Sequence, residues 1–133
     1  MIVNVIEPSA GTLLDCACGS GGMFVQTGDF VNQAGMSANK SMTFFGQEKV
    51  EYNAKLCLMN MAVHGLTGVI KSGDEANTFY HDAHNLAGCC EILSCKLIQC
   101  FTNHNRETPW NQALWKVACF FHIRCLSSRS GKP

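Results

Sequence analysis

Three short apolar runs, each followed by glycine or polar residues, are spread along the first half of the chain. They cover residues 12–15, 42–46 and 69–71, and their length and composition are those of buried strands. Between them, apolar residues recur at helical spacing over residues 23–34 and 49–64. The order strand, helix, strand, helix, strand predicts an α/β fold with a parallel sheet and right-handed crossovers.

Each predicted helix has an apolar face that we expect to be buried, and each is followed by a glycine that can end it, Gly35 or Gly65. Residues 2–6 precede this pattern and fit the end of a helix or a short strand, which Pro8 ends. The residues expected to be buried are Met23, Phe30, Val31 and Ala34 in the first helix and Val50, Ala54, Cys57, Leu58, Met61 and Ala62 in the second.

The pattern is lost after Leu86, and the composition changes near the same point. Residues 1–88 hold four Lys or Arg, eight Asp or Glu and three of the nine cysteines. Residues 89–133 hold six Lys or Arg, two Asp or Glu and six cysteines. Residues 89–100 fit a strand or a helix equally well. We therefore divide the chain into an α/β part, residues 1–88, and a divergent tail, residues 89–133.

The loop after the first predicted strand combines an acid with closely spaced glycines. Gly19, Gly21 and Gly22 allow positive φ and a close approach of the backbone to a ligand, and Ser20 lies among them. Amide groups at the start of the helix that follows favour a carboxylate or a phosphate. Asp15, at the end of the strand, is suited to a cationic amino group.

Polar residues also follow the second and third predicted strands. Glu48 comes directly after the second strand, at the distance from the glycines that nucleoside-binding folds use for the acid that holds a ribose. Asp74 and Asn77 follow the third strand, and either one suits the amino group of an adenine. Because ligands of parallel sheets bind at the carboxyl ends of the strands, these groups together predict S-adenosyl-L-methionine as the cofactor.

Two other interpretations of these residues remain open. NAD is the rival ligand, although its fingerprint is G-x-G-x-x-G and the spacing here is Gly19-x-Gly21-Gly22. Alternatively, the glycines form only a tight turn, and Glu48 only stabilises the start of the helix after it by about 0.3–1 kcal/mol.

The same residues resemble a known family, the modification (methylase) subunit of type I restriction–modification systems, which is an N6-adenine-specific DNA methyltransferase. The resemblance extends over residues 2–88. It rests on residues 5–8, 15–26, 45–48, 58–65, 76–79 and 84–86. It implies a partial Rossmann-like S-adenosylmethionine-dependent methyltransferase fold with an irregular C-terminal tail.

The resemblance also implies a reaction and partners. The methyl group of S-adenosylmethionine passes directly to N6 of a flipped-out adenine in DNA, with no metal and no covalent intermediate. The implied partners are DNA and the specificity and restriction subunits of a type I complex, in which the specificity subunit sets the DNA target.

The chain departs from the family pattern in three places. The family has proline where Cys16 stands and an acid where Asn77 stands. Its fourth strand ends in Asn-Pro-Pro-Phe or Asn-Pro-Pro-Tyr, which binds the target adenine, and this chain has prolines only at positions 8, 109 and 133. We therefore assign no catalytic residue, and we expect the chain to hold the methyl-donor half and to be inactive alone.

The missing motif suggests what happens near residue 88. One hypothesis is a gene fragment whose reading frame changes there, so that residues 89–95 replace the fourth strand. A three-strand sheet then has an unpaired edge where the fourth strand belongs, which predicts poor solubility unless the tail covers that edge. The alternative function is a non-catalytic remnant that binds a nucleoside or the cofactor.

The bulk composition narrows the remaining possibilities. With 133 residues, 47% of them apolar and 15% charged, the chain is long enough and apolar enough for one ordered domain. Its net charge of zero gives no nucleic-acid footprint. There is no signal peptide and no membrane-length apolar run, and the cysteine count is odd, so we expect a cytoplasmic protein with reduced thiols.

The cysteines and histidines also raise the question of a zinc site. Cys90, Cys95 and Cys100 are spaced by five, whereas structural zinc sites favour two pairs of the Cys-x2-4-Cys type. Cys16 and Cys18 lie in the glycine loop, far from the others in sequence. We therefore predict no metal.

Overall fold

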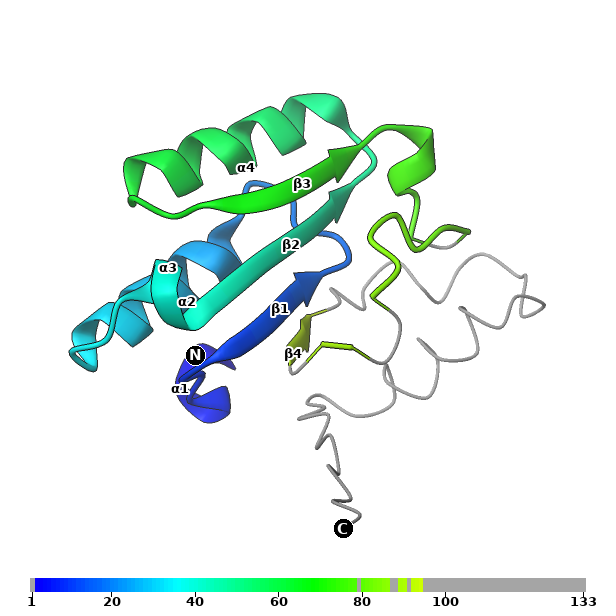
Figure 1. Cartoon of the computed structure of the whole chain (residues 1–133). Coiled ribbons are helices and arrows are strands. Elements are labelled where there is room, and N and C mark those ends of the chain that lie inside the picture. Colours follow the sequence, from blue (N-terminus) through cyan, green and yellow to red (C-terminus); the bar gives the residue numbers. More distant parts are fainter. Residues whose placement is uncertain (1, 79, 87–88, 91, 95–133) are drawn as a thin grey trace, which may run out of the picture.

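A computed structural model describes residues 2–78, 80–86, 89–90 and 92–94 of the chain, and the tail beyond Ser94 lies outside the described residues. The predicted strands and helices are confirmed, with bounds that move by at most two residues. In chain order the elements are α1 (Ile2–Ile6), β1 (Gly11–Asp15), α2 (Gly22–Gln33), α3 (Ala38–Ser41), β2 (Met42–Glu48), α4 (Glu51–Val63), β3 (Gly68–Ser72), the 3-10 helix η1 (Asp74–Ala76) and β4 (Ile92–Ser94) (Figure 1).

The strands form one parallel sheet in the order β3-β2-β1-β4. Asp15 at the end of β1 pairs with Gly46, and Glu48 at the end of β2 pairs with Ser72 at the end of β3. The carboxyl ends of these three strands therefore meet at one edge of the sheet (Figure 1). The predicted α/β fold with a parallel, partial Rossmann-like sheet is confirmed.

The fourth strand corrects one prediction. Residues Ile92–Ser94 pair in parallel with Leu13–Asp15, so the prediction of a three-strand sheet with an unpaired edge beside β1 is wrong over these residues. Ile92 is 8% exposed and belongs to the apolar core. Periodicity does not separate a short buried strand from a helix, which is why the sequence left both open here. The premise of the predicted poor solubility is thereby removed.

One face of the sheet is covered by α2 and α4, which contact each other, and α4 also contacts β2 and β3. Phe24 of α2 meets Phe44 of β2 edge-on, with ring centroids 5.7 Å apart. Gly28 allows α2 to pack tightly, because a Cβ there would lie 2.6 Å from Leu66 Cδ1. Gly28 thus lets α2 approach the chain that follows α4.

The buried faces of both helices differ in part from those predicted. In α2 the prediction is right for Val31 and wrong for Met23 and Phe30, which are half-buried, and for Ala34, which is exposed. Helical spacing fits several overlapping faces, and the contact between Phe24 and Phe44 selects the one that also buries Thr27 and Gly28. In α4 the prediction is right for Ala54, Cys57 and Met61 and wrong for Val50, Leu58 and Ala62, which are exposed.

The other face of β2 is covered near its carboxyl end by the chain that follows β3. Side chains alternate along a strand, so Phe45 and Gln47 point away from the helices. Phe45 meets the ring of His84 edge-on at 5.1 Å, and Gln47 is fully buried. Among the described residues, no helix has the length and hydropathy that crossing a membrane requires.

Candidate functional site

The glycine loop between β1 and α2 is held in a tight left-handed turn. Gly19 and Gly21 have φ of 54° and 81°, and the Gly21 amide donates to the carbonyl of Cys18 at 2.8 Å. The Cys18 amide in turn donates to the carbonyl of Gln47 at 3.1 Å, which fixes the loop against the end of β2. Left-handed backbone disfavours side chains, so the turn requires glycine at both positions.

The loop presents open space above the start of α2. A Cβ on Gly19 or Gly22 would meet no atom within 4 Å, whereas a Cβ on Gly21 would lie 2.7 Å from Cys57 Sγ. Gly21, the residue before α2, provides no side-chain cap for the first amides of this 12-residue helix. The site therefore combines room for a ligand with backbone donors that favour a carboxylate.

Glu48 joins this loop to the start of α4. Its Oε2 accepts the Gly19 amide at 3.0 Å, and its Oε1 accepts the Val50 amide at 2.9 Å. A carboxylate has about four acceptor positions, so each oxygen retains capacity for a hydroxyl group. If Glu48 only stabilised the start of the following helix, it would need to contact that helix alone. It does contact the start of the helix, but it also contacts the glycine loop.

Asp15 and Ser20 take different places around the same loop. Asp15 is 5% exposed, and its Oδ1 accepts the Ala17 amide at 3.1 Å, so this carboxylate shapes the turn from below. Ser20 is exposed, and its carbonyl accepts Asn60 Nδ2 of α4 at 2.8 Å. The loop is thus held from β1, β2 and α4 together.

The chain after β3 brings the remaining predicted residues to the same edge. Asp74 is exposed in η1, and its carbonyl accepts the amide of the half-buried Asn77 at 3.1 Å. The next residue, Thr78, donates from Oγ1 to the carbonyl of Cys16, which connects this segment to the glycine loop. This contact holds the residue after Asn77 against the loop, and it does not choose between Asp74 and Asn77.

The thiols of Cys18, in the loop, and Cys57, in α4, contact each other. Both are buried, and the Cys18 thiol donates a hydrogen bond to Cys57. That hydrogen bond, together with burial and the nearby carboxylates of Asp15 and Glu48, raises the pKa of Cys18 far above its usual value. The proton therefore stays on Cys18, and the two buried thiols pack the loop against α4.

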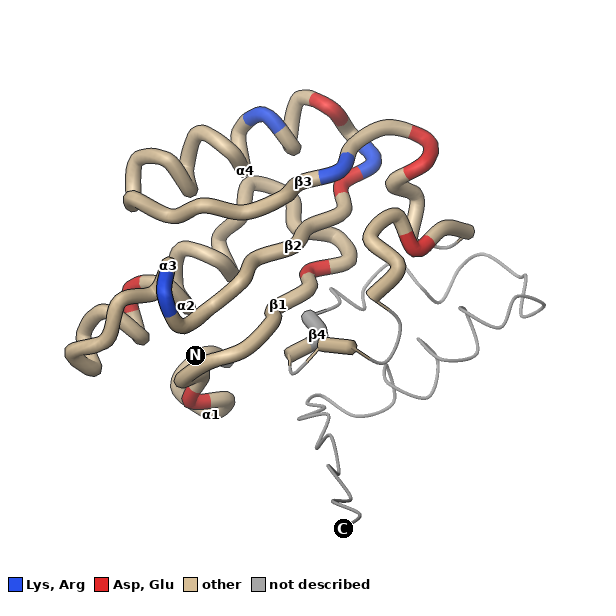
Figure 2. Tube along the Cα trace, in the orientation of Figure 1, with Lys and Arg blue, Asp and Glu red and all other residues tan. Residues whose placement is uncertain are grey.

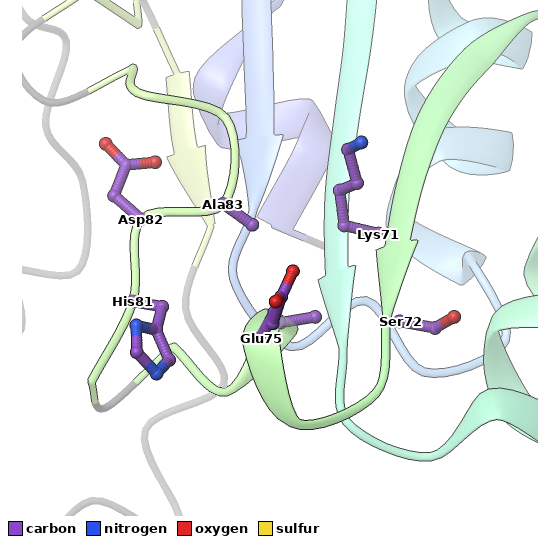
Figure 3. Close-up of a pocket in the computed structure, with 7 residues that line it drawn as sticks. Lys71, Ser72, Glu75, His81, Asp82 and Ala83 are labelled. Carbon is purple, nitrogen blue, oxygen red and sulfur yellow. The ribbon is translucent and has the colours of Figure 1, made fainter.

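A hollow lies just beyond these residues. It has a volume of about 300 Å³ and is lined by residues 71, 72, 75, 76 and 81–83. His81, Asp82 and Ala83 lie on one side of it and Lys71 and Ser72 on the other, with Glu75 between (Figure 3). None of the eight predicted site residues lines this pocket, although Glu75 and Ala76 stand between Asp74 and Asn77 in sequence.

Charges gather around this edge of the sheet. Figure 2 shows acidic and basic positions close together at the carboxyl ends of β2 and β3 and at the start of α4.

Within the part of the chain that the structure describes, no three His, Cys, Asp or Glu residues are grouped as a metal site would need. Cys95 and Cys100 of the zinc interpretation lie outside the described residues.

Sequence reasoning missed several residues that build the site. Gln47, Asn60 and Thr78 each hold part of it through a side-chain hydrogen bond to a backbone carbonyl. None of the three carried a local signal, and Gln47 follows the predicted strand of residues 42–46. Asn60 and Thr78 are polar residues on a helix and in a loop, where such residues are ordinary.

Comparison with known proteins places the chain in a family. Residues 1–119 match the family described as N-6 DNA Methylase. The chain is 33% identical over 82 residues to the Type I restriction enzyme MjaIX methylase subunit of Methanocaldococcus jannaschii, which is 62% of this chain and 14% of that protein. It is 41% identical over 66 residues to the Type I restriction enzyme HindI methylase subunit of Haemophilus influenzae, which is 50% of this chain and 15% of that protein. The chain thus spans about a seventh of the length of these curated relatives.

Replacing Gly21 tests the geometry of the loop without any ligand. Gly21→Ala places a Cβ at positive φ and against Cys57 Sγ. We expect the free energy of unfolding to fall by about 2 kcal/mol or more. Gly22→Ala is the matched control, because its Cβ meets open space, and it should stay within about 0.5 kcal/mol of the parent. Urea unfolding followed by circular dichroism measures both, and equal stability of the two variants would contradict the described loop.

Proposed function

The chain belongs to the N-6 DNA methylase family, and from that membership we propose that it binds S-adenosyl-L-methionine at the carboxyl ends of β1, β2 and β3. The observation that carries the proposal is the hydrogen bond between the Gly19 amide and Glu48 Oε2. It brings an open glycine loop and a ribose-type carboxylate, from two neighbouring strands, to one place. A turn that served only to connect β1 with α2 would not need it.

Each part of the cofactor has a candidate partner among these residues. The backbone of the glycine loop, Gly19 to Gly22 with Ser20 among them, would receive the carboxylate of the methionine half. Asp15 would attract its ammonium group, and Glu48 would accept the ribose hydroxyls. Asp74 or Asn77 would contact the adenine amino group. The residues present therefore fit the cofactor, and NAD is disfavoured by the glycine spacing.

For the protein to which this chain belongs, we propose N6-adenine methylation of DNA. The cofactor supplies an electrophilic methyl group, and this chain's residues bind and orient it. The sequence holds no Asn-Pro-Pro-Phe or Asn-Pro-Pro-Tyr to receive the target adenine, so no residue here is assigned to the acceptor side. The relatives are named as subunits of type I restriction enzymes, which supports DNA and the specificity and restriction subunits as partners in the cytoplasm.

The second candidate function is cofactor binding without chemistry, and the missing acceptor motif favours it for the chain alone. The proposed division of the chain near residue 88, with a change of reading frame, stays a prediction. Both β4 and the family match through residue 119 extend past that point. Translating all three frames of the gene around codon 88 tests it, because the hypothesis requires the acceptor motif in another frame.

Titration with S-adenosylmethionine in a calorimeter tests the cofactor site. We expect Glu48→Gln to weaken binding roughly ten- to hundredfold, since hydrogen bonds to a charged group are each worth about 1.5–3 kcal/mol. Glu51→Gln is the control, because it makes the same change of charge on an exposed residue three positions away. If Glu48→Gln binds as tightly as the parent and Glu51→Gln, the ribose assignment is wrong.

Methyl transfer separates the two candidate functions for this chain alone. We expect no tritium to pass from labelled S-adenosylmethionine to duplex DNA, because the residues that would align the adenine amino group are absent. A complete adenine methyltransferase serves as the positive control in the same assay. Labelled N6-methyladenine formed by the purified chain would overturn the proposal that it holds only the donor side.

A further inference from the structure

Gln47 is a polar side chain in a place where an apolar one would be expected. It is fully buried at the carboxyl end of β2, on the sheet face away from the helices. Its Nε2 donates to the carbonyl of His81 at 3.0 Å and lies 3.5 Å from that of Ala76, while its Oε1 is buried without a hydrogen-bond partner. A buried carbonyl oxygen left unpaired costs free energy, so burial alone does not explain an amide here.

The two carbonyls that Gln47 contacts bracket the segment that we assign to adenine. Ala76 and His81 stand on either side of Asn77 in sequence, and both line the pocket of about 300 Å³. Between η1 and β4, none of the described residues forms a helix or strand. With no ladder of backbone hydrogen bonds to place this segment, side-chain contacts must set its position.

Neighbouring residues of β2 hold the same segment further along. His84 Nε2 lies 2.9 Å from the carbonyl of Gly46, and the ring of His84 packs edge-on against Phe45. Three consecutive residues of β2, Phe45 to Gln47, therefore hold this segment, and Glu48, the next residue, contacts the glycine loop. The end of β2 thus connects both halves of the proposed site.

We propose that Gln47 is a positioning residue that holds residues 74–78 and 80–81 so that Asp74 or Asn77 stands at the adenine of the bound cofactor. This inference rests on the proposed function. Gln47 itself has no exposed surface and does not touch the cofactor. Its amide therefore acts through the two carbonyls that it holds. It affects cofactor affinity only through the contact that the segment makes with the adenine.

Gln47→Met separates positioning from a merely structural role. Methionine has a similar volume, removes the amide donor and also removes the unpaired carbonyl. We expect the melting temperature to stay level, because removing the unpaired Oε1 offsets the loss of the donor to the Ala76 and His81 carbonyls, while the Kd for S-adenosylmethionine weakens roughly five- to tenfold, as the loss of one or two net hydrogen bonds implies. A structural role predicts the reverse pattern, with lowered stability and affinity falling only as far as unfolding explains. Gln33→Met, at an exposed position of α2, is the matched control.

A double-mutant cycle shows whether Gln47 acts through the adenine-contacting residues. In the background Asp74→Ala/Asn77→Ala, adding Gln47→Met should leave the Kd unchanged, because the contact that it positions is already gone. If the Kd weakens there by the same factor as in the parent, Gln47 acts by another route and the proposal is overturned. All of these titrations use the full chain.

Hydrogen exchange without ligand separates this inference from the cofactor assignment. The amides of Asn77, Tyr80 and His81 are hydrogen-bonded within the segment, and we expect Gln47→Met to speed their exchange at least fivefold. Amides of α4 should be unchanged. Unchanged exchange in the segment overturns the inference whether or not the parent binds cofactor. A parent that fails to bind S-adenosylmethionine refutes the proposed function, and with it the adenine role of Gln47, even where exchange shows that Gln47 holds the segment.

Discussion

The carboxylate of Glu48 is the contact on which the site depends. Its two oxygens accept one amide from the glycine loop and one from the start of α4, at Gly19 and Val50. These amides belong to the loops that follow β1 and β2, so a single side chain sets the spacing between two crossover connections. Parallel strands bring their carboxyl ends to one edge of a sheet but do not fix how the loops above them lie. In this chain the Glu48 carboxylate fixes the position of these two loops.

Close packing beneath the glycine loop adds to the contacts that Glu48 makes. Gly46 admits Phe24 and Cys18 next to β2, since a Cβ there would lie 3.0 Å from Cys18 Sγ and 3.1 Å from Phe24 Cε2. Gly21 in the same way admits Cys57 of α4. The small residues and buried thiols thus bring β2, α2 and α4 close together.

The sequence predicted those parts of the fold and the site that depend on local pattern. The order of strands and helices and the parallel sheet followed from apolar periodicity, and the strand-end positions of Asp15, Glu48 and the glycines followed from the sheet. The buried side of each helix did not follow, because the contact between Phe24 and Phe44, distant in sequence, chooses among faces of similar apolarity. For β4 the sequence left strand and helix open, because three residues are too few to show a period, and pairing with β1 fixes its place. The role of Gln47 depends on carbonyls 29 and 34 residues away, which no local pattern reports.

The glycine amides themselves offer the most direct test of the cofactor site. The chain has 12 glycines, so labelling them with ¹⁵N gives a simple spectrum that can be followed as S-adenosylmethionine is added. The account predicts saturable shifts of the Gly19, Gly21 and Gly22 resonances, with those of Gly35 and Gly65, which follow α2 and α4, unchanged. Shifts confined to Gly35 and Gly65, or none at saturating cofactor, would contradict a binding site at the carboxyl ends of β1 and β2.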